Sequence, residues 1–205
     1  MNIDFYFDIM SPFAYLARHR LEQIVQNYSC TVTYKPIDLA QAKLAVGNTG
    51  PSNREMPVKL KYLVEDLKRW AGKYDVPFGF IGNVNTALIN KGVFYAEKHD
   101  RTVDYVREAY RVTWGESGAP DDVELLRKLA LNFGWRPSDF LSFIESEEAE
   151  IAYKATINEA ISKGVFGVPT MMIGEEMWWG NDRLFMVDEY LFSHAEPSQP
   201  RVVTN

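Results

Sequence analysis

The chain has 205 residues, of which 46% are hydrophobic and 24% charged, a balance that supports a buried core without disulfides or structural metals. Its net charge of −6 argues against nucleic acid as a partner, because proteins that bind nucleic acids usually present a basic face.

Several other classes of protein are also disfavoured. No segment approaches the roughly 20 apolar residues of a membrane span, and the first residues lack the pattern of a signal peptide. The only cysteine is Cys30, which excludes an internal disulfide and a cysteine-based metal cluster. The three histidines are too scattered to suggest a zinc site. We therefore expect a cytoplasmic protein with no metal, no membrane anchor and no nucleic-acid partner.

The first elements form a strand, a helix and a strand. Residues 3–8 (IDFYFD) are rich in aromatic side chains, which is typical of a strand. From Pro12 to Tyr28 apolar residues recur every three or four positions, as in an amphipathic helix, and residues 30–35 (CTVTYK) alternate again. Ser11 is placed to cap this helix, since Pro12 suits the first helical position. Two strands joined through a helix are expected to be parallel.

The remainder of the chain is mainly helical until a short hairpin. Residues 46–57 form a polar loop rich in Gly, Asn and Pro, too broken for regular structure. A long stretch of helical pattern follows. Residues 170–179 contain two short apolar runs joined by Gly-Glu, which predicts a β-hairpin. Asn181 or Asp182 then caps a last helix that ends near Leu191.

This order of elements predicts an α/β protein with a thioredoxin-like fold, β-α-β and later β-β-α, interrupted by a large all-helical insertion. Residues 1–38 and 165–192 would form the discontinuous thioredoxin-like domain. Residues 39–164 would supply a linker loop and the helical insertion domain, and residues 193–205 a disordered tail.

Ser11 is the first candidate for chemistry, and it has two interpretations. As an N-cap it contributes about 0.5–2 kcal/mol of helix stability. As a functional group it presents a hydroxyl at the positive end of a helix, where thiolates and other anions are stabilised. An acylating serine is disfavoured, because the chain has no Gly-x-Ser-x-Gly motif and no histidine pattern of a hydrolase triad.

Three further segments are candidates with equally plain structural interpretations. A trans Val168–Pro169 bond is the ordinary expectation, whereas a cis bond would turn the Val168 N–H and C=O toward a neighbouring loop, ready to pair with an extended peptide. Asn181 and Asp182 either cap a helix or bind a group that carries a carboxylate and an ammonium. The polar loop from Asn48 to Lys59 is a weak signal, because most such loops are only solvated.

Six segments, in this order, are similar to one known family: FYFDIMSPFAYLA (5–17), GNTGPSNRE (47–55), VKLKYLVEDLKRW (58–70), WGE (114–116), FGVPT (166–170) and MWWGNDRL (177–184). Together they resemble the 2-hydroxychromene-2-carboxylate isomerase family, bacterial enzymes of naphthalene breakdown that are related to kappa-class glutathione transferases and DsbA-like proteins. The resemblance runs from about residue 1 to residue 192.

The resemblance implies a thioredoxin fold with a helical insertion and glutathione as cofactor. DsbA relatives begin their first helix with Cys-x-x-Cys, but this chain has Ser11 there and no cysteine, so disulfide exchange is excluded. In the family this serine is the catalytic residue. The resemblance also implies one residue beside the substrate, Asn53, and five glutathione contacts: Asn48, Lys59, Val168, Asn181 and Asp182. On the same resemblance we expect the Val168–Pro169 bond to be cis and to place Val168 beside the start of the first helix.

The reaction implied by the resemblance interconverts 2-hydroxychromene-2-carboxylate, a small aromatic carboxylate, and trans-o-hydroxybenzylidenepyruvate. Reversible thiolate addition, bond rotation and elimination would leave glutathione unchanged, with Ser11 as hydrogen-bond donor to the thiolate. The family is typically homodimeric. Two alternatives remain: a kappa-like glutathione transferase that conjugates electrophiles, and a non-catalytic peptide-binding module.

Overall fold

The computed structural model describes residues 1–82 and 84–196. Its sheet has the strand order β2-β1-β3-β4, with β1 (Asn2–Phe7), β2 (Thr31–Pro36), β3 (Thr170–Ile173) and β4 (Glu176–Trp179). β1 and β2 are parallel, whereas β3 is antiparallel to both β1 and β4. The predicted parallel pair and the predicted hairpin are therefore both confirmed.

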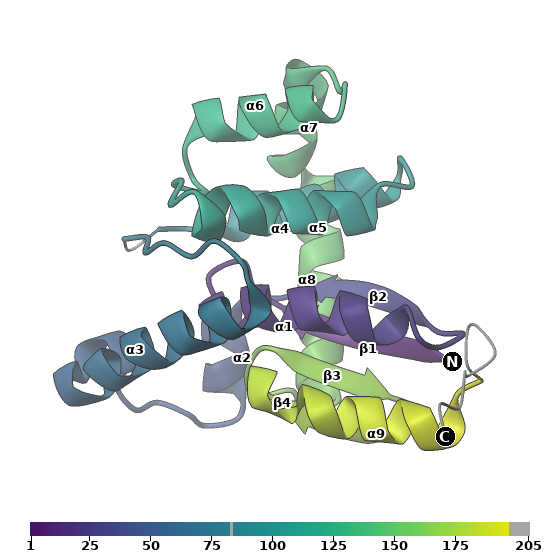
Figure 1. Cartoon of the computed structure of the whole chain (residues 1–205). Coiled ribbons are helices and arrows are strands. Elements are labelled where there is room, and N and C mark those ends of the chain that lie inside the picture. The colour runs from purple at the N-terminus through teal and green to yellow at the C-terminus, as the bar shows by residue number, and fades with distance from the viewer. Residues whose placement is uncertain (83, 197–205) are drawn as a thin grey trace.

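The helices form two groups around this sheet (Figure 1). One group consists of α1 (Pro12–Val25), α2 (Leu39–Ala45), α3 (Pro57–Tyr74), α8 (Glu147–Ser162) and α9 (Leu184–His194), and the other of α4 (Ala87–Glu97), α5 (Thr102–Tyr110), α6 (Val123–Asn132) and α7 (Pro137–Ile144). The second group is stacked beyond one edge of the sheet, as expected for an inserted helical block. Short turns of other helix types occur at η1 (Asn53–Glu55), η2 (Arg111–Gly115) and η3 (Asn181–Arg183). None of the helices in the described ranges is long and apolar enough to cross a membrane.

Alternation along β1 explains why both faces of the sheet are covered. Successive strand residues point to opposite faces. Ile3, Phe5 and Phe7 are fully buried in the larger core, with α1, α9 and the insertion, while Tyr6 is fully buried in a second core formed with α2 and α8. Each such side chain contributes about 1.5–3 kcal/mol by leaving water. β1 is thus an inner strand of the sheet, buried on both faces, and it fixes the position of the residues that follow it.

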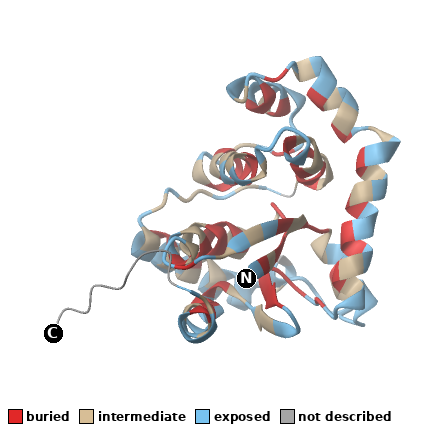
Figure 2. Ribbon diagram, turned by 90° about the vertical axis from the view of Figure 1, so that its right-hand side faces the viewer, coloured by how far each residue is buried: buried red, intermediate tan, exposed pale blue. Residues whose placement is uncertain are grey.

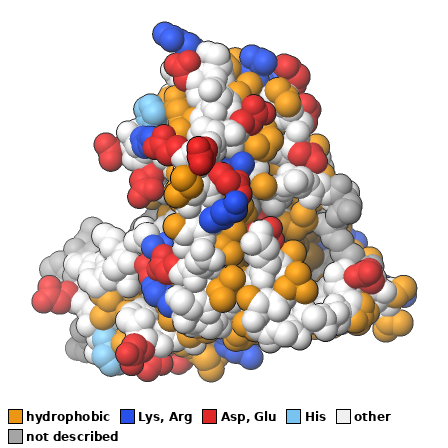
Figure 3. Space-filling model, turned by 180° about the vertical axis from the view of Figure 1, so that it is seen from behind, with side chains coloured by type: hydrophobic (Ala, Val, Ile, Leu, Met, Phe, Trp, Pro, Cys, Tyr) orange, Lys and Arg blue, Asp and Glu red, His pale blue; other side chains and the backbone are white. Residues whose placement is uncertain are grey.

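Helix α8 connects the insertion to the far face of the sheet, and Figure 2 shows it running along the side of the molecule. Its exposed surface carries ion pairs: Glu159 bonds to Lys35 at 3.0 Å and to Lys163 at 2.9 Å. Burial acts to raise the pKa of Glu159, but bonds from Lys163, Lys35 and Tyr6 outweigh it and bring the pKa to about 2. Seen from behind, acidic and basic side chains accordingly lie next to one another (Figure 3).

The structure differs from the sequence-based expectation in two places before the insertion. Residues 39–45, expected to be linker, form helix α2, which the Asp38 carboxylate caps at the N–H groups of Ala40 and Gln41. The loop expected over 46–57 contains the turn η1. Of α2 only Ala42 is buried, so the segment lacks the apolar stripe by which helices are recognised.

The last helix also differs at both ends. Gly180, at φ 107, precedes η3, so neither Asn181 nor Asp182 is the cap residue. α9 continues to His194, beyond the expected start of the tail at residue 193. The Glu196 C=O accepts a hydrogen bond of 2.8 Å from the Ser29 N–H, and the expected tail from 197 onward lies outside the described residues. The proposed division into two domains otherwise stays a prediction.

Candidate active site

Ser11 lies in the connection between β1 and α1, and it caps the helix as predicted. Its backbone is extended, and its Oγ accepts a hydrogen bond of 3.2 Å from the Ala14 N–H. Pro12 occupies the first helical position. A hydroxyl has one donor hydrogen and two acceptor lone pairs, and in the described part of the chain the Ser11 O–H donates to no other group. Capping therefore leaves this hydrogen available to an anion at the helix start, although Ser11 is only 6% exposed.

Asp8 anchors the segment that carries Ser11, residues 8–11, called here the Ser11 loop. The Asp8 carboxylate accepts hydrogen bonds from the Met10 N–H at 3.0 Å and the Leu39 N–H at 3.1 Å. It also accepts them from the Thr86 hydroxyl at 2.7 Å and the Asn90 amide at 2.9 Å. Burial raises the pKa of Asp8, and these four donors oppose that rise. One carboxylate thereby joins the Ser11 loop to α2 and to the insertion.

The insertion also binds the backbone of the Ser11 loop directly. The Ile9 N–H donates to Asn90 Oδ1 at 3.1 Å, and the Ile9 C=O accepts from Trp114 Nε1 at 2.7 Å. The Asp8 C=O accepts from the Tyr110 hydroxyl at 3.0 Å. None of these residues was predicted from the sequence as a site residue, because the insertion lies far from Ser11 along the chain. Asp8 and Trp114 do fall within the family segments FYFDIMSPFAYLA and WGE, whereas Asn90 and Tyr110 fall in none of the six.

The Val168–Pro169 bond is cis, which confirms the expectation drawn from the family resemblance. Tyr6 pairs with Thr170, the first residue of β3, in antiparallel register, so Val168 precedes β3 at the end of the sheet where residues 8–11 follow β1. The N–H and C=O of Val168 take part in no hydrogen bond within the described residues, while the Pro169 C=O accepts from the Gly180 N–H at 2.9 Å. Val168 therefore lies at the same end of the sheet as the Ser11 loop, with an N–H and a C=O that form no hydrogen bond among the described residues.

Asn181 and Asp182 follow Gly180 but differ in environment. Asn181 is 3% exposed, and among the described residues its amide nitrogen and oxygen form no hydrogen bond of normal geometry. Its amide is nevertheless close enough to the Tyr74 hydroxyl to lower a pKa that burial raises. The Asp182 side chain is 57% exposed and pairs with Arg183 at 2.5 Å. One residue thus presents unsatisfied buried polar atoms, and its neighbour a solvated carboxylate.

Asn48, Asn53 and Lys59 are exposed, and no hydrogen bond or ion pair among the described residues joins them to Ser11, Val168, Asn181 or Asp182. Asn48 follows α2, Asn53 begins η1 and Lys59 is in the first turn of α3. α3 meets α1 through its opposite end, where Tyr74 lies 6.4 Å from the His19 ring. At 1.5 Å per residue, Lys59 is roughly 20 Å along the helix from that contact. The structure therefore brings Ser11, Val168 and Asn181 to one end of the sheet and leaves these three residues on a flank.

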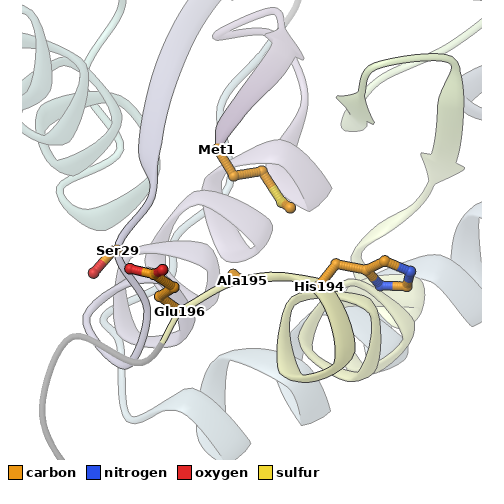
Figure 4. Close-up of a pocket in the computed structure, with 5 residues that line it drawn as sticks. All are labelled: Met1, Ser29, His194, Ala195 and Glu196. Atoms are coloured by element: carbon orange, nitrogen blue, oxygen red, sulfur yellow. The ribbon is translucent and has the colours of Figure 1, made fainter.

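A shallow hollow elsewhere on the surface is lined by Met1, Ser29, His194, Ala195 and Glu196 (Figure 4). Met1 precedes β1 and Ser11 follows it, so the hollow lies at the opposite end of the strand. It is separate from the candidate site.

Comparison with known proteins identifies the family of this chain. The sequence model of the DSBA-like thioredoxin domain family matches residues 2–192. A 2-hydroxychromene-2-carboxylate isomerase from Pseudomonas sp. (strain C18) is 47% identical over 186 residues, which cover 91% of this chain and 88% of that protein. The chain belongs to this isomerase family, within the DSBA-like thioredoxin proteins.

A solved structure and a distant relative extend the comparison. The structure of a 2-hydroxychromene-2-carboxylate isomerase superposes with a TM-score of 0.90 at 45% identity, covering 94% of this chain and 95% of that one. The glutathione S-transferase kappa 1 of Caenorhabditis elegans is 23% identical, covering 93% of this chain and 90% of its own. The family expectation drawn from the six segments and the thioredoxin-like fold with a helical insertion are both confirmed.

Proposed function

We propose that the protein is a glutathione-dependent isomerase that interconverts 2-hydroxychromene-2-carboxylate and trans-o-hydroxybenzylidenepyruvate. The observation that carries the proposal is Ser11: in a chain 47% identical to such an isomerase, its hydroxyl begins a helix at the place where disulfide exchangers hold a cysteine. The chain supplies no thiol there, so the thiol comes with the cofactor.

Free polar groups around Ser11 fit an extended peptide such as glutathione. The unpaired N–H and C=O of Val168 can form two backbone hydrogen bonds with the cysteinyl residue. The buried Asn181 amide forms no hydrogen bond of normal geometry among the described residues, which is costly unless a ligand completes its bonding. Asp182 at the start of η3 offers a carboxylate to the γ-glutamyl ammonium group. Asn48 and Lys59 would complete the site from the α2–α3 side.

Ser11 and the start of α1 can together hold a thiolate at neutral pH. A thiol with a pKa of about 8.5 is mostly protonated at pH 7, and lowering this pKa by two units takes about 2.7 kcal/mol. A hydroxyl that donates to a charged acceptor contributes about 1.5–3 kcal/mol. A helix N-terminus adds about 0.3–1 kcal/mol. The sum suffices without a general base.

When bound, glutathione would supply a nucleophile that adds reversibly to the conjugated double bond, which can then rotate. The residues of this chain orient the reactants and stabilise charge. Ser11 Oγ keeps its acceptor role toward Ala14 while its O–H donates to the sulfur, so the serine stays in place through the cycle. Val168 fixes the direction of the cofactor backbone, and Asn53 faces the substrate. No step requires a redox change, in keeping with the lack of a cysteine pair.

The test compares wild type with Ser11→Ala in a glutathione-dependent absorbance assay on 2-hydroxychromene-2-carboxylate. Loss of about 1.5–3 kcal/mol of thiolate stabilisation should slow turnover at pH 7 about 10- to 150-fold and move the pH profile upward. Full activity with an unmoved profile would reduce Ser11 to a cap. Stoichiometric loss of glutathione would instead indicate a kappa-like transferase. The absence of thiolate absorbance when glutathione is added would indicate a non-catalytic module.

The resemblance also supports a homodimer that works in the cytoplasm. Light scattering on the purified protein and fractionation of cells that express it test these two parts of the proposal.

A further inference from the structure

We propose that Tyr110 and Trp114, on the inserted helical block, are positioning residues that hold the Ser11 hydroxyl in its working place. This inference rests on the proposed function of Ser11. It concerns the side of the Ser11 loop opposite to Val168, where the insertion meets the loop.

Tyr110 acts on Ser11 through a single shared atom. The Ser11 N–H donates to the Asp8 C=O at 2.9 Å, and the Tyr110 hydroxyl donates to the same oxygen at 3.0 Å. The carbonyl that holds Ser11 is thus itself held by the insertion. Burial raises the pKa of Tyr110 well above its ordinary value, so its hydroxyl remains protonated and donates.

The Tyr110 ring has little freedom to move. It is completely buried, with its centroid 5.8 Å from that of Tyr15 in a stacked arrangement and 5.9 Å from that of Phe7. Tyr15 is on α1 and Phe7 ends β1, the two elements that flank the Ser11 loop. Close packing on both sides therefore transmits the position of the insertion to the loop.

Trp114 binds the next carbonyl in the same way. Its indole N–H donates to the Ile9 C=O at 2.7 Å, and its ring stacks on Phe78 with an interplanar angle of 3°. Trp114 belongs to η2, a π-helix that continues α5 without a break. π-helical turns are rare and frequently occur at functional sites. Tyr110, the last residue of α5, and Trp114, in this turn, are four positions apart and donate to successive carbonyls of one loop.

A simpler explanation of the Tyr110 and Trp114 hydrogen bonds is that they only stabilise the fold, because most buried hydroxyls and carbonyls form a hydrogen bond. Tyr105 separates the two explanations. It is on α5, as fully buried as Tyr110, and its hydroxyl also donates to a backbone carbonyl, that of Ile89, at 2.8 Å. Ile89 is in α4 of the insertion, and among the described residues its own atoms form no hydrogen bond with the Ser11 loop, which α4 reaches only through the side chain of the neighbouring Asn90. If the hydroxyls only stabilise the fold, Tyr110→Phe and Tyr105→Phe are equivalent.

The experiment measures both variants in three ways. Hydrogen–deuterium exchange of the peptide containing residues 8–11, in the protein without glutathione, should accelerate in Tyr110→Phe and not in Tyr105→Phe. The pKa of the glutathione thiol, followed by thiolate absorbance in the binary complex, should rise by about 0.7 unit in Tyr110→Phe alone. Its kcat at pH 7 should fall about fivefold with little change in KM, and recover at higher pH. Trp114→Phe should repeat these effects and replaces Tyr110→Phe if that variant does not fold.

The outcomes separate this inference from the function on which it rests. Equal exchange and equal thiol pKa in Tyr110→Phe and Tyr105→Phe, with a normal thiolate band in wild type, overturn the inference alone. A wild-type protein that shows no thiolate band with glutathione overturns the proposed function and the inference together.

Discussion

The Ser11 loop and the segment from Asn48 to Lys59 are both polar connections, but the first is held by hydrogen bonds and the second is exposed to solvent. In the Ser11 loop, hydrogen bonds from the loop itself, α2 and the insertion fix the Asp8 carboxylate and the backbone around it. In the second segment, Asn48, Asn53 and Lys59 are all exposed, and Lys59 forms no ion pair with any described side chain. The proposed site thus has a preformed half that holds the thiol and an open half that faces solvent.

This difference has a consequence for binding. A preformed group adds to affinity without further ordering, whereas each long side chain fixed on binding costs about 0.5–1.5 kcal/mol. The Ser11 side should therefore determine chemistry and fold stability together. The open side should tune affinity and leave the fold unaffected.

The largest expected effect is on stability, at Asp8. Asp8→Ala removes the acceptor of four hydrogen bonds, two of them from the buried Thr86 and Asn90 side chains, so we expect a loss of about 3 kcal/mol or more in the free energy of unfolding. Asn53→Ala, in the open half, should stay within about 0.5 kcal/mol. Chemical denaturation of both variants measures the contrast. Equal stability of the two variants would show that the Ser11 loop is no better anchored than the exposed segment.

The same contrast explains what the sequence could predict. Ser11 as a cap, the parallel pair and the hairpin depend on neighbouring residues, and all three are confirmed. The Asp8 network depends on Leu39, Thr86 and Asn90, which lie 31, 78 and 82 residues away. Periodicity and capping rules describe neighbours within a turn or two. They therefore identified Ser11 but not the groups that hold it.

The errors have equally local causes. α2 was missed because a helix of 7 residues with one buried side chain gives almost no amphipathic signal. The cap of the last helix was placed too early because Asn and Asp are good caps, whereas the N-cap position of α9 is Arg183, and Asn181 and Asp182 lie in the turn η3 that follows Gly180 at φ 107. Only the backbone conformation distinguishes these adjacent positions.

A second, smaller effect, on glutathione affinity, is expected at Asn181 and Asp182. These adjacent residues show the same contrast, because Asn181 is buried and Asp182 is solvated. Asn181→Ala removes buried polar atoms that have no partner within the described chain. It should leave stability unchanged or slightly improved and weaken glutathione about tenfold, because a ligand would lose those hydrogen bonds. Asp182→Ala should weaken glutathione only about fivefold and in a salt-dependent way, since its carboxylate is solvated. Calorimetry at two salt concentrations decides, and unchanged affinity in either variant removes that residue from the site.

The smallest effect is expected at Lys59, and α3 provides its control. Lys61 is equally exposed, carries the same charge and lies two residues further along the helix, about 200° around its axis. If Lys59 contacts glutathione as a solvated cation, Lys59→Ala should weaken binding about two- to fivefold at low salt, and high salt should abolish the difference. Lys61→Ala removes the same net charge from the same helix but faces away, so its affinity should remain that of wild type. Equal losses in both variants would mean that only the general field of the lysine-rich helix attracts glutathione. No loss in either would confine the binding site to the preformed half around Ser11, Val168 and Asn181.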